Sequence, residues 1–388
     1  MTAVLDRSTR ALSRLAPPTL TTLPHAVAAN VAEVRRRTAA TVMAVVKADG
    51  YGLGAVPVAR AAVDAGAGWL GLTDIADAAA LRDAGLRVPM LAWLHPAGID
   101  VRAARRSAVD VAVGSVDELR RLIADVEADV EADVEADDVD GAPVRVHLNL
   151  DTGMARGGCP IDEWSALLRV ARGARDTVEV RGIMGHLPRA EEGTPEANAA
   201  AVQRLRRGRD AALRDGLGPV IVHLAATAGT LADPATHFDL VRIGAGLVGI
   251  DPSETVALAG AARLTAAVVH TARVRAGTPV GYGGGHVMER TTHLSVLGLG
   301  YADGIPRELS PAASVEIGGR RHPIVGRVSM DQIVVDTGDE VVPRGTIATV
   351  FGPDGGGVPS VQEWARWAGT IPHTILTGIG PRVRRSVA

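Results

Sequence analysis

Between residues 42 and 246 the sequence alternates eight times between a short apolar run and a helical pattern. Such runs are typical of buried strands. Repeated strand–helix units predict a parallel (β/α)8 barrel, and the span is close to the ~250 residues typical of that fold. An open doubly wound sheet is the alternative, but no Gly-x-Gly-x-x-Gly turn supports it. The runs are Val42–Val46, Trp69–Thr73, Pro89–Trp93, Val109–Val113, Val144–Leu150, Val178–Met184, Val220–Leu224 and Phe238–Ile243.

After about residue 256 short β-rich runs separated by glycine and proline turns replace this alternation, which predicts a mainly β second domain. We therefore expect a barrel domain over residues 18–250 and a β domain over 256–388, with residues 1–17 as an extension or packed on the barrel. One helical pattern, Ser360–Ala368, interrupts the β runs, and we expect the basic tail Gly378–Arg385 to lie on the surface. The β runs are Ala266–Val274, Thr292–Leu299, Ser314–Ile317, Ile324–Val328, Ile333–Val335 and Thr346–Phe351.

Composition excludes several kinds of partner. The 388 residues carry a formal net charge of −3, which offers no electrostatic case for nucleic acid binding. Cys159 is the only cysteine, so neither an intrachain disulfide nor a cysteine-built zinc site is expected. We find no secretory signal and no apolar run long enough to span a bilayer, and we expect a cytoplasmic protein. An acidic repeat over residues 124–138 predicts a solvated helix end or an insertion.

Lys47 ends the first apolar run and precedes a turn that contains Gly50, Gly52 and Gly54. Glycine lets the backbone turn sharply and approach a ligand closely. A buried ammonium group is costly, whereas a lysine that loses its proton is a nucleophile suited to Schiff-base chemistry. From this stretch alone, a strand-end lysine that merely reaches solvent is the other interpretation.

Polar residues follow several of the predicted strands, at the end of the barrel where (β/α)8 enzymes form their active sites. A single histidine at such a position is more often structural. A lysine, two arginines and histidines on one rim, however, suit an anionic cofactor and a carboxylate substrate. The rim residues are Lys47, Asn149, Asp151, Arg156, His186, His223, Thr227, Arg242 and Gly244.

The segment Val46-Lys47-Ala-Asp-Gly-Tyr51-Gly resembles the cofactor segment of the alanine racemases, a pyridoxal-phosphate (PLP) family of fold type III. The resemblance implies that Lys47 holds PLP covalently and that Tyr51 contacts its phosphate. Asp151-Thr-Gly-Met154-Ala-Arg156 is similar to the family segment whose arginine binds the substrate carboxylate. Further barrel motifs extend the implied cofactor-binding set, which is Lys47, Tyr51, His186, Thr227, Arg242, Gly244, Ala245 and His373. Within it Arg242 faces the pyridine nitrogen, and His186 bonds to the catalytic tyrosine.

Two motifs of the second domain also resemble this family. Gly300-Tyr301-Ala-Asp303-Gly304 is similar to a Gly-Tyr-Ala-Asp-Gly motif, and the resemblance implies that Tyr301 is the second catalytic base. Gly326-Arg-Val-Ser-Met330-Asp331-Gln332 resembles a motif near the substrate carboxylate, which implies that Met330 and Asp331 bind substrate. In the family the tyrosine reaches the lysine of a partner subunit, so the resemblance implies a homodimer with shared active sites.

The chain departs from the family pattern at several positions and is in this sense a divergent member. Asn149 stands where many relatives have a lysine whose carbamate positions the arginine, so we expect Arg156 to rely on a bound anion or to be reoriented. The other departures are Ala226 for an amide residue, Val248, His322 and His373 for tyrosines, Leu53 for a histidine and Ser329 for a cysteine. They predict slower turnover or a broadened choice of amino acid.

The predicted function is a two-base racemase that interconverts L- and D-alanine, or a related small amino acid, with Lys47 and Tyr301 on opposite faces of the substrate. A tyrosine has an ordinary pKa near ~10, and we expect positive charge on His186 and Arg242 to favour its phenolate. Three alternatives stay open. They are a racemase for another amino acid, a decarboxylase or aldolase on the same scaffold, and a PLP-binding module without turnover.

Overall fold

The computed structural model describes residues 15–95, 98–132, 142–353 and 355–388. These residues form two compact units, each described here by itself. The first, the barrel unit, comprises Thr21–Ala262 together with Pro372–Thr377 and Arg385–Ala388. The second, the β unit, comprises Arg263–Ile371 together with Gly378–Arg384 and the described residues up to Leu20.

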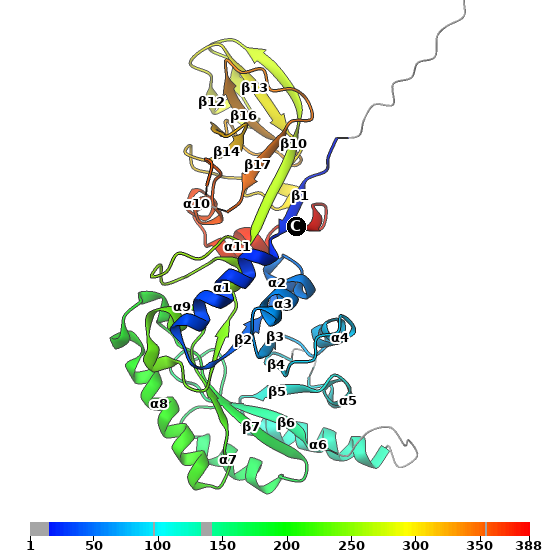
Figure 1. Cartoon of the computed structure of the whole chain (residues 1–388), viewed down its shortest axis with the longest axis vertical. Helices are drawn as coiled ribbons and strands as arrows, with labels where there is room; N and C mark the ends of the chain where they lie inside the picture. Colours follow the sequence, from blue (N-terminus) through cyan, green and yellow to red (C-terminus); the bar gives the residue numbers. More distant parts are fainter. Residues whose placement is uncertain (1–14, 96–97, 133–141, 354) are drawn as a thin grey trace, which may run out of the picture. The chain divides into compact units, whose positions relative to one another are not determined.

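The barrel unit contains a closed, parallel, eight-stranded barrel in which each strand pairs with its neighbours in chain order, and β2 pairs with β9 to close it (Figure 1). The (β/α)8 prediction is therefore confirmed. Each strand lies within two residues of a predicted run. The largest difference is at β9, which begins late because Phe238 has a left-handed φ of 51°. The strands are β2 (Thr41–Val45), β3 (Trp69–Leu72), β4 (Met90–Ala92), β5 (Val109–Val113), β6 (Val144–Asn149), β7 (Val178–Met184), β8 (Ile221–His223) and β9 (Leu240–Ile243).

Helices alternate with these strands around the barrel (Figure 1). They are α1 (Pro24–Arg37), α2 (Lys47–Tyr51), α3 (Ala55–Asp64), α4 (Ala76–Asp83), α5 (Val101–Arg106), α6 (Val116–Ala132), α7 (Trp164–Gly173), α8 (Pro195–Arg214), α9 (Thr227–Ala232) and α11 (Pro372–Thr377). Three 3-10 turns, η1 (Ala190–Glu192), η2 (Pro234–Thr236) and η3 (Ala245–Val248), complete the unit.

Side chains fill the barrel interior in layers. Met43, Leu91, Ala112 and Leu240 belong to a buried apolar cluster contributed by several strands. Side chains two residues apart on a strand face the same side, so Arg242 follows Leu240 into the interior, and it is also buried. The apolar layer thus supports a polar layer that lies nearer the carboxyl ends of the strands.

The acidic repeat is only partly described. Helix α6 carries it as far as Ala132, and residues 133–138 lie outside the described residues. The expectation of a wholly solvated helix end is wrong for Asp129, which is buried and forms ion pairs with Arg102 and Arg105 of α5. One carboxylate of the repeat therefore anchors α6 to the neighbouring helix.

The β unit is mainly β, as predicted. One sheet runs in the order β15-β14-β17-β10-β1-β18, with β13 paired to β10 and β16 paired to β13. The elements are β1 (Thr19–Thr22), β10 (Ala262–Val274), β11 (Pro279–Val280), η4 (Tyr282–Gly284), β12 (His286–Val287), β13 (Thr292–Leu297), η5 (Tyr301–Asp303), β14 (Ser314–Ile317), β15 (Arg320–Pro323), β16 (Ile333–Gly338), β17 (Ile347–Phe351), α10 (Val361–Trp367) and β18 (Arg384–Val387). Ser360 and Glu363 form a capping box that begins α10, the predicted helix.

The predicted strand Ile324–Val328 is wrong, and the strand lies earlier, at Arg320–Pro323. Gly318 and Gly319 both have positive φ and form a two-residue hairpin turn that pairs β15 with β14. Gly326 then bends the chain with a φ of 71°, and a Cβ there would lie 2.9 Å from the carbonyl oxygen of Val280. The strand pattern that follows Pro323 is therefore broken by a glycine that must approach another backbone closely.

The prediction of a surface tail at Gly378–Arg385 is also wrong in part. The chain ends in strand β18, while Ile379 and Val383 are buried. Within the barrel unit, the Arg385 guanidinium donates a hydrogen bond to the carbonyl of Gly52 (3.2 Å). The sequence did not reveal these buried positions, because the apolar residues of the segment are few, irregularly spaced and separated by basic residues.

Asn30 provides a test of how α1 is held on the barrel. Its buried amide donates to the carbonyls of Leu247 (3.2 Å) and Ala259 (2.8 Å) and accepts from the Ala259 N–H (2.8 Å). We expect Asn30→Ala to lower the free energy of unfolding by about 1–3 kcal/mol for each buried group left unpaired. Denaturant unfolding would measure this, with Arg36→Ala as control, because its pair with Glu33 is exposed and should contribute below about 1 kcal/mol. Equal losses of unfolding free energy in both variants would contradict the conclusion that Asn30 holds α1 on the barrel.

Candidate active site

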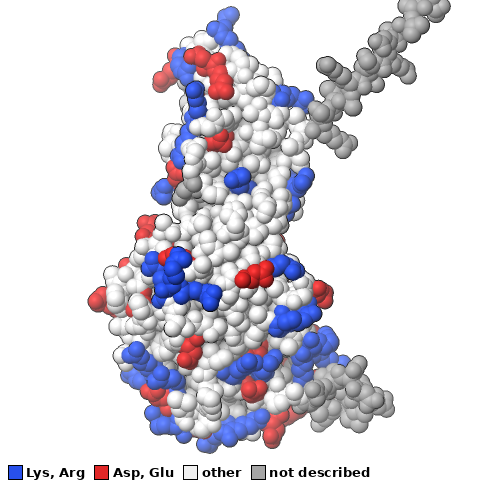
Figure 2. Space-filling model, viewed as in Figure 1, with Lys and Arg blue, Asp and Glu red and all other residues white. Residues whose placement is uncertain are grey.

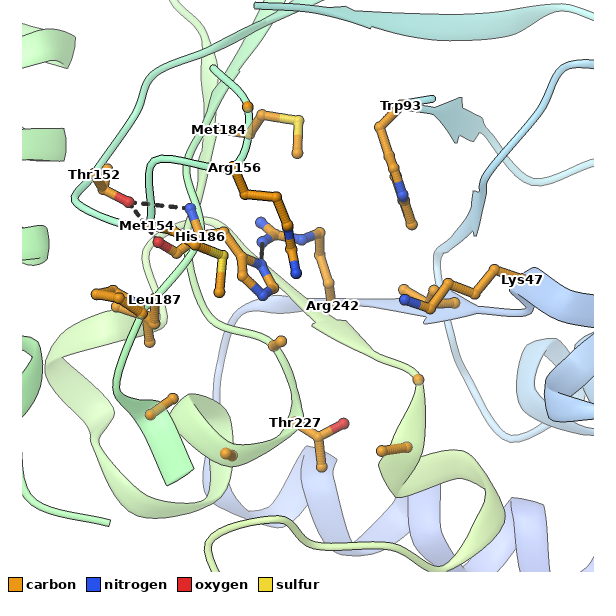
Figure 3. Close-up of a pocket in the computed structure, with 18 of the residues that line it drawn as sticks. Lys47, Trp93, Thr152, Met154, Arg156, Met184, His186, Leu187, Thr227 and Arg242 are labelled. Atoms are coloured by element: carbon orange, nitrogen blue, oxygen red, sulfur yellow. Dashed lines mark hydrogen bonds between the residues drawn. The ribbon is translucent and has the colours of Figure 1, made fainter. Parts of the chain in front are cut away.

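A cavity of about 660 Å³ is lined by residues at the carboxyl ends of the barrel strands. Figure 3 shows Lys47 on one side of it and Arg156, His186 and Arg242 on the other. Eleven predicted residues of the barrel unit line it together, and they are Lys47, Tyr51, Asn149, Asp151, Arg156, His186, Thr227, Arg242, Gly244, Ala245 and His373. The convergence predicted from the strand ends is therefore present in the structure.

A left-handed backbone turn positions Lys47 and Tyr51. We expected a glycine-rich loop, but Ala48, Asp49, Gly50 and Tyr51 have successive φ values of 52°, 51°, 62° and 60°. Such a conformation costs a non-glycine residue roughly 1–2 kcal/mol and persists only where surrounding contacts enforce it. One such contact is the hydrogen bond that the Asp49 carboxylate accepts from the Ala55 N–H (2.7 Å). The turn places both functional side chains in the cavity.

Lys47 shares the cavity with two guanidinium groups. Burial lowers its pKa, and the positive charges of Arg156 and Arg242 lower it further. A larger fraction of the amine is thus neutral than for a lysine in water, which favours it as nucleophile and base. The same three cations make the cavity a strong attractor for anions.

One end of the cavity can hold a phosphate group. Burial raises the pKa of Tyr51 to about 12, so its hydroxyl remains a donor. A Cβ on Gly244 would lie 2.1 Å from that hydroxyl, so glycine is required beside it. The Thr227 hydroxyl oxygen accepts from the Gly246 N–H (3.1 Å), which leaves its own proton to donate to a ligand. These donors suit the oxygens of a phosphate, and the residues fit the predicted cofactor.

His373 lies at the same end, on α11. Its ring centroid is 6.0 Å from that of Tyr51, with the planes tilted by 47°. Its Nδ1 is buried and has no hydrogen-bond partner among the described residues. Burial lowers the pKa of His373, Lys47 lowers it further, and the Glu191 carboxylate opposes both. A buried polar atom is rarely left unpaired, so this nitrogen suits a ligand acceptor or donor.

Arg242 is buried, and four hydrogen bonds hold its guanidinium group. One terminal nitrogen donates to the carbonyls of Gly185 (2.8 Å) and Leu224 (3.0 Å) and to Nδ1 of His186 (3.1 Å). The other donates to Nδ1 of His223 (2.9 Å). Burial lowers the pKa of Arg242 to about 10, so it remains a cation at neutral pH.

The positive charge expected on His186 is absent. Burial, followed by the charges of Arg242, Arg156 and Lys47, lowers the pKa of His186 to about 3. Since Nδ1 accepts from Arg242, the proton of the neutral ring is on Nε2, where it can donate to a partner. Of the two groups expected to supply positive charge, only Arg242 carries it.

Two further residues, Asp110 and His147, were not predicted as part of the site. His223 Nε2 lies 2.8 Å from His147 Nδ1, and His147 Nε2 lies 3.3 Å from the Asp110 carboxylate. Because Arg242 can only donate to His223, both imidazoles must be neutral with the proton on Nε2. A single line of hydrogen bonds thus runs from Arg242 to Asp110, which also pairs with Arg145 (3.0 Å) and Arg181 (3.7 Å). A charged residue within the apolar run Val109–Val113 was the signal in the sequence.

The cavity wall includes other residues that the sequence did not single out. Trp93, at the end of the third predicted run, packs over Gly71, where a Cβ would lie 2.7 Å from its ring. Met184 and Glu191 also line the cavity. Three departures from the family pattern, Asn149, Ala226 and His373, line the cavity, so they can affect the site directly.

The predicted residues of the β unit cluster within that unit. The backbone N–H groups of Tyr301 and Ala302 donate to the carbonyls of Ser329 (3.0 Å) and Met330 (2.9 Å). The Arg382 guanidinium pairs with Asp331 (2.6 Å) and with buried Asp303 (3.2 Å). The structure therefore brings the two β-unit motifs together. Two further departures, Val248 in η3 and His322 in β15, are buried.

The sequence matches two family descriptions. "Alanine racemase, N-terminal domain" matches residues 24–252, and "Alanine racemase, C-terminal domain" matches residues 261–387. A protein named alanine racemase from Salinispora tropica is 41% identical over 359 residues, covering 92% of this chain and 94% of that protein. One from Thermobifida fusca is 40% identical over 366 residues, covering 93% and 95% respectively.

Solved structures of alanine racemases have the same fold as this chain. Alanine racemase from Streptomyces lavendulae superposes with a TM-score of 0.89 at 35% identity, covering 97% of this chain and 98% of that one. The Bacillus anthracis enzyme with bound L-Ala-P gives 0.84 at 29% identity, covering 96% and 95%. The Bartonella henselae enzyme with covalently bound pyridoxal phosphate gives 0.82 at 27% identity, covering 96% and 100%.

The line of hydrogen bonds from Arg242 to Asp110 can be tested by ¹⁵N NMR. We expect His147 and His223 to stay neutral Nε2–H tautomers between about pH 5 and pH 8, because burial lowers both pKa values. Asp110→Asn keeps the shape but replaces a charged acceptor with a neutral one, so the hydrogen bond from His147 Nε2–H should weaken and its resonance should shift. The exposed carboxylate of Glu179, on β7, provides the control Glu179→Gln. Identical His147 resonances in both variants would contradict a role for Asp110.

Proposed function

The chain belongs to the alanine racemase family and interconverts L- and D-alanine, and on that premise we propose which residues bind the cofactor and move the proton. PLP is the cofactor of this family. When bound, it withdraws electrons from the amino acid and so acidifies the proton on Cα. Lys47 would hold it covalently, and Tyr51, Thr227, His373 and the backbone at Gly244 and Ala245 would hold its phosphate. The donor set at that end of the cavity carries this proposal.

Lys47 is the proposed base on one face of the substrate. Its lowered pKa makes the neutral amine more abundant at physiological pH, and the neutral amine accepts the Cα proton. Arg156 would bind the substrate carboxylate. Asn149 cannot supply the negative charge of a carbamate, so its expected effect on Arg156 and on turnover stays a prediction.

Arg242 would donate to the pyridine nitrogen. Four hydrogen bonds to protein acceptors hold the guanidinium in place. Its pKa of about 10 keeps it protonated, so it neither accepts a proton nor readily gives one to the ring. A ring nitrogen without a proton favours simple proton exchange over transamination.

The second base would be a tyrosine of the β unit. The chain has three tyrosines, and Tyr51 is excluded because its pKa of about 12 makes it a poor base. Tyr301, implied by the resemblance, stays a candidate. Tyr282 is a second candidate, which we rank first because its side chain is 66% exposed, against 37% for Tyr301, and it stands on a turn between Gly281 and Gly283. To act as a base in the active site of a partner subunit, the tyrosine side chain must be exposed on the surface of its own unit.

We further propose a cytoplasmic homodimer in which this tyrosine reaches the Lys47 site of the partner subunit. In the described part of the chain, none of the helices has the length and apolarity to cross a membrane.

On the face shown in Figure 2, positive and negative side chains are interspersed over the barrel unit, which supports a small amino acid as partner more than a polyanion.

The assignment of Lys47 can be tested by borohydride reduction followed by peptide mapping. We expect reduction to fix PLP to the peptide that contains Lys47, because a lysine-linked cofactor is the only form that borohydride makes permanent. Lys47→Arg, which keeps the charge, is the control and should give no labelled peptide. Lys47 is the only lysine of the sequence, so label on a peptide that lacks it, or no label after added PLP, would contradict the proposal.

Replacing each tyrosine with phenylalanine tests the second base, since only the hydroxyl is lost. We expect Tyr282→Phe to lower kcat by about 10²–10⁴-fold, the usual contribution of a positioned base, and Tyr301→Phe to lower it much less. If Tyr301→Phe instead lowers kcat more than Tyr282→Phe does, Tyr301 is the second base. Full activity in both variants would contradict the two-base proposal.

Mixing inactive Lys47→Ala chains with chains that lack the catalytic tyrosine tests the shared site. One hybrid site would then have both bases, and partial activity should return. Mixing Lys47→Ala with Lys47→Arg chains is the control and should restore nothing. No recovery after verified subunit exchange would contradict a site shared between subunits.

A further inference from the structure

We propose that His373 couples phosphate binding to proton uptake, so that its imidazole is neutral beside Tyr51 and becomes protonated when a phosphomonoester dianion binds there. This inference rests on the proposed cofactor site and goes beyond it, because it concerns the strength and pH dependence of cofactor binding rather than the racemisation.

The geometry places His373 where a phosphate would bind. Its ring lies 6.0 Å from that of Tyr51, centroid to centroid, and the Tyr51 hydroxyl lies against Gly244. The imidazole, the phenol and the backbone at Gly244 therefore share one end of the cavity. Thr227 also lines this cavity and has a hydroxyl proton to donate.

The unpaired ring nitrogen of His373 is available to a ligand. Nδ1 of His373 is buried and has no hydrogen-bond partner among the described residues. A neutral imidazole has one donor nitrogen and one acceptor nitrogen, whereas an imidazolium has two donors. Phosphate oxygens without protons only accept. Protonation therefore converts His373 into the form that can bind a phosphate through either nitrogen.

The charges around His373 explain why the proton is taken up on binding. The groups that face it are Lys47, Tyr51 and Glu191. Burial and Lys47 hold the pKa of His373 below its usual value, Glu191 opposes them, and Tyr51 stays neutral. A dianion in hydrogen-bonding contact favours the imidazolium and raises this pKa. The tyrosine found here in the family would stay neutral in both states.

The sign of the pH dependence follows from linkage. Because the pKa of His373 is higher with phosphate bound than without it, affinity is greatest below the pKa of the free site. It falls by up to about tenfold per pH unit as the pH rises from that value to the pKa of the bound state. Since the pKa of the free site lies below 6.5, the fall begins below neutral pH.

Isothermal titration calorimetry with pyridoxamine 5′-phosphate tests this inference. This ligand has an amine in place of the aldehyde, so it cannot bond to Lys47, and binding is measured without covalent chemistry. The full-length protein, freed of cofactor, and its His373→Tyr and His373→Gln variants would be titrated from about pH 6 to about pH 8, in two buffers of different ionisation enthalpy. The second ionisation of the phosphate itself, with a pKa near ~6, contributes equally to all three proteins.

We expect wild type to take up more protons than either variant and to lose affinity more steeply with pH, by up to about tenfold per unit. With pyridoxamine, which lacks the phosphate, the three pH dependences should coincide. Equal proton uptake and equal slopes in wild type and His373→Tyr would overturn the inference while leaving the cofactor assignment intact. No binding by wild type would overturn both, and the borohydride labelling of Lys47 would report that failure separately.

Discussion

The burial of one guanidinium group determines how the interior of this barrel is organised. A cation inside a protein is tolerated only when its hydrogen-bond donors are satisfied and its charge is compensated. Arg242 meets the first requirement with two backbone carbonyls and two imidazole nitrogens. Its positive charge is compensated in part by the buried carboxylate of Asp110, to which His223 and His147 connect it through hydrogen bonds. Donor and acceptor roles along this line are fixed at both ends, so Arg242 cannot turn without breaking a buried bond.

The sequence was sufficient for the fold and for most of the barrel site. Eight apolar runs separated by helical patterns can be buried together in few ways, and the residues at their carboxyl ends necessarily gather on one rim. For this reason Lys47, Arg156, His186, Thr227 and Arg242 were found without a structure. The predictions were wrong where the backbone adopts a conformation with positive φ, which the hydrophobic pattern does not reveal. Gly326 turned a predicted strand into a bend, and the turn after Lys47 became left-handed instead of loose.

What the sequence could not provide was charge state and pairing across the chain. His186 was expected to be cationic, but its burial among three positive groups makes it neutral. Asp110 and His147 are 37 positions apart and meet only because β5 and β6 are neighbours. Tyr282 and Tyr301 are likewise distinguished by exposure, which no motif encodes. In each case the deciding quantity is the surroundings of a side chain, and these exist only after folding.

The cavity also explains why strain and positive charge occur together. Lys47, Arg156 and Arg242 repel one another, and the turn that carries Lys47 holds three non-glycine residues in a left-handed conformation. Both costs must be offset by the rest of the barrel. The repulsion decreases once an anion binds among the cations. A site of this kind is more stable with its anionic ligand than without it. Cofactor binding and local stability are therefore linked through these positive charges. Beyond the effect of burial, Arg156 and Arg242 lower the pKa of Lys47, and Lys47 in turn lowers that of His373.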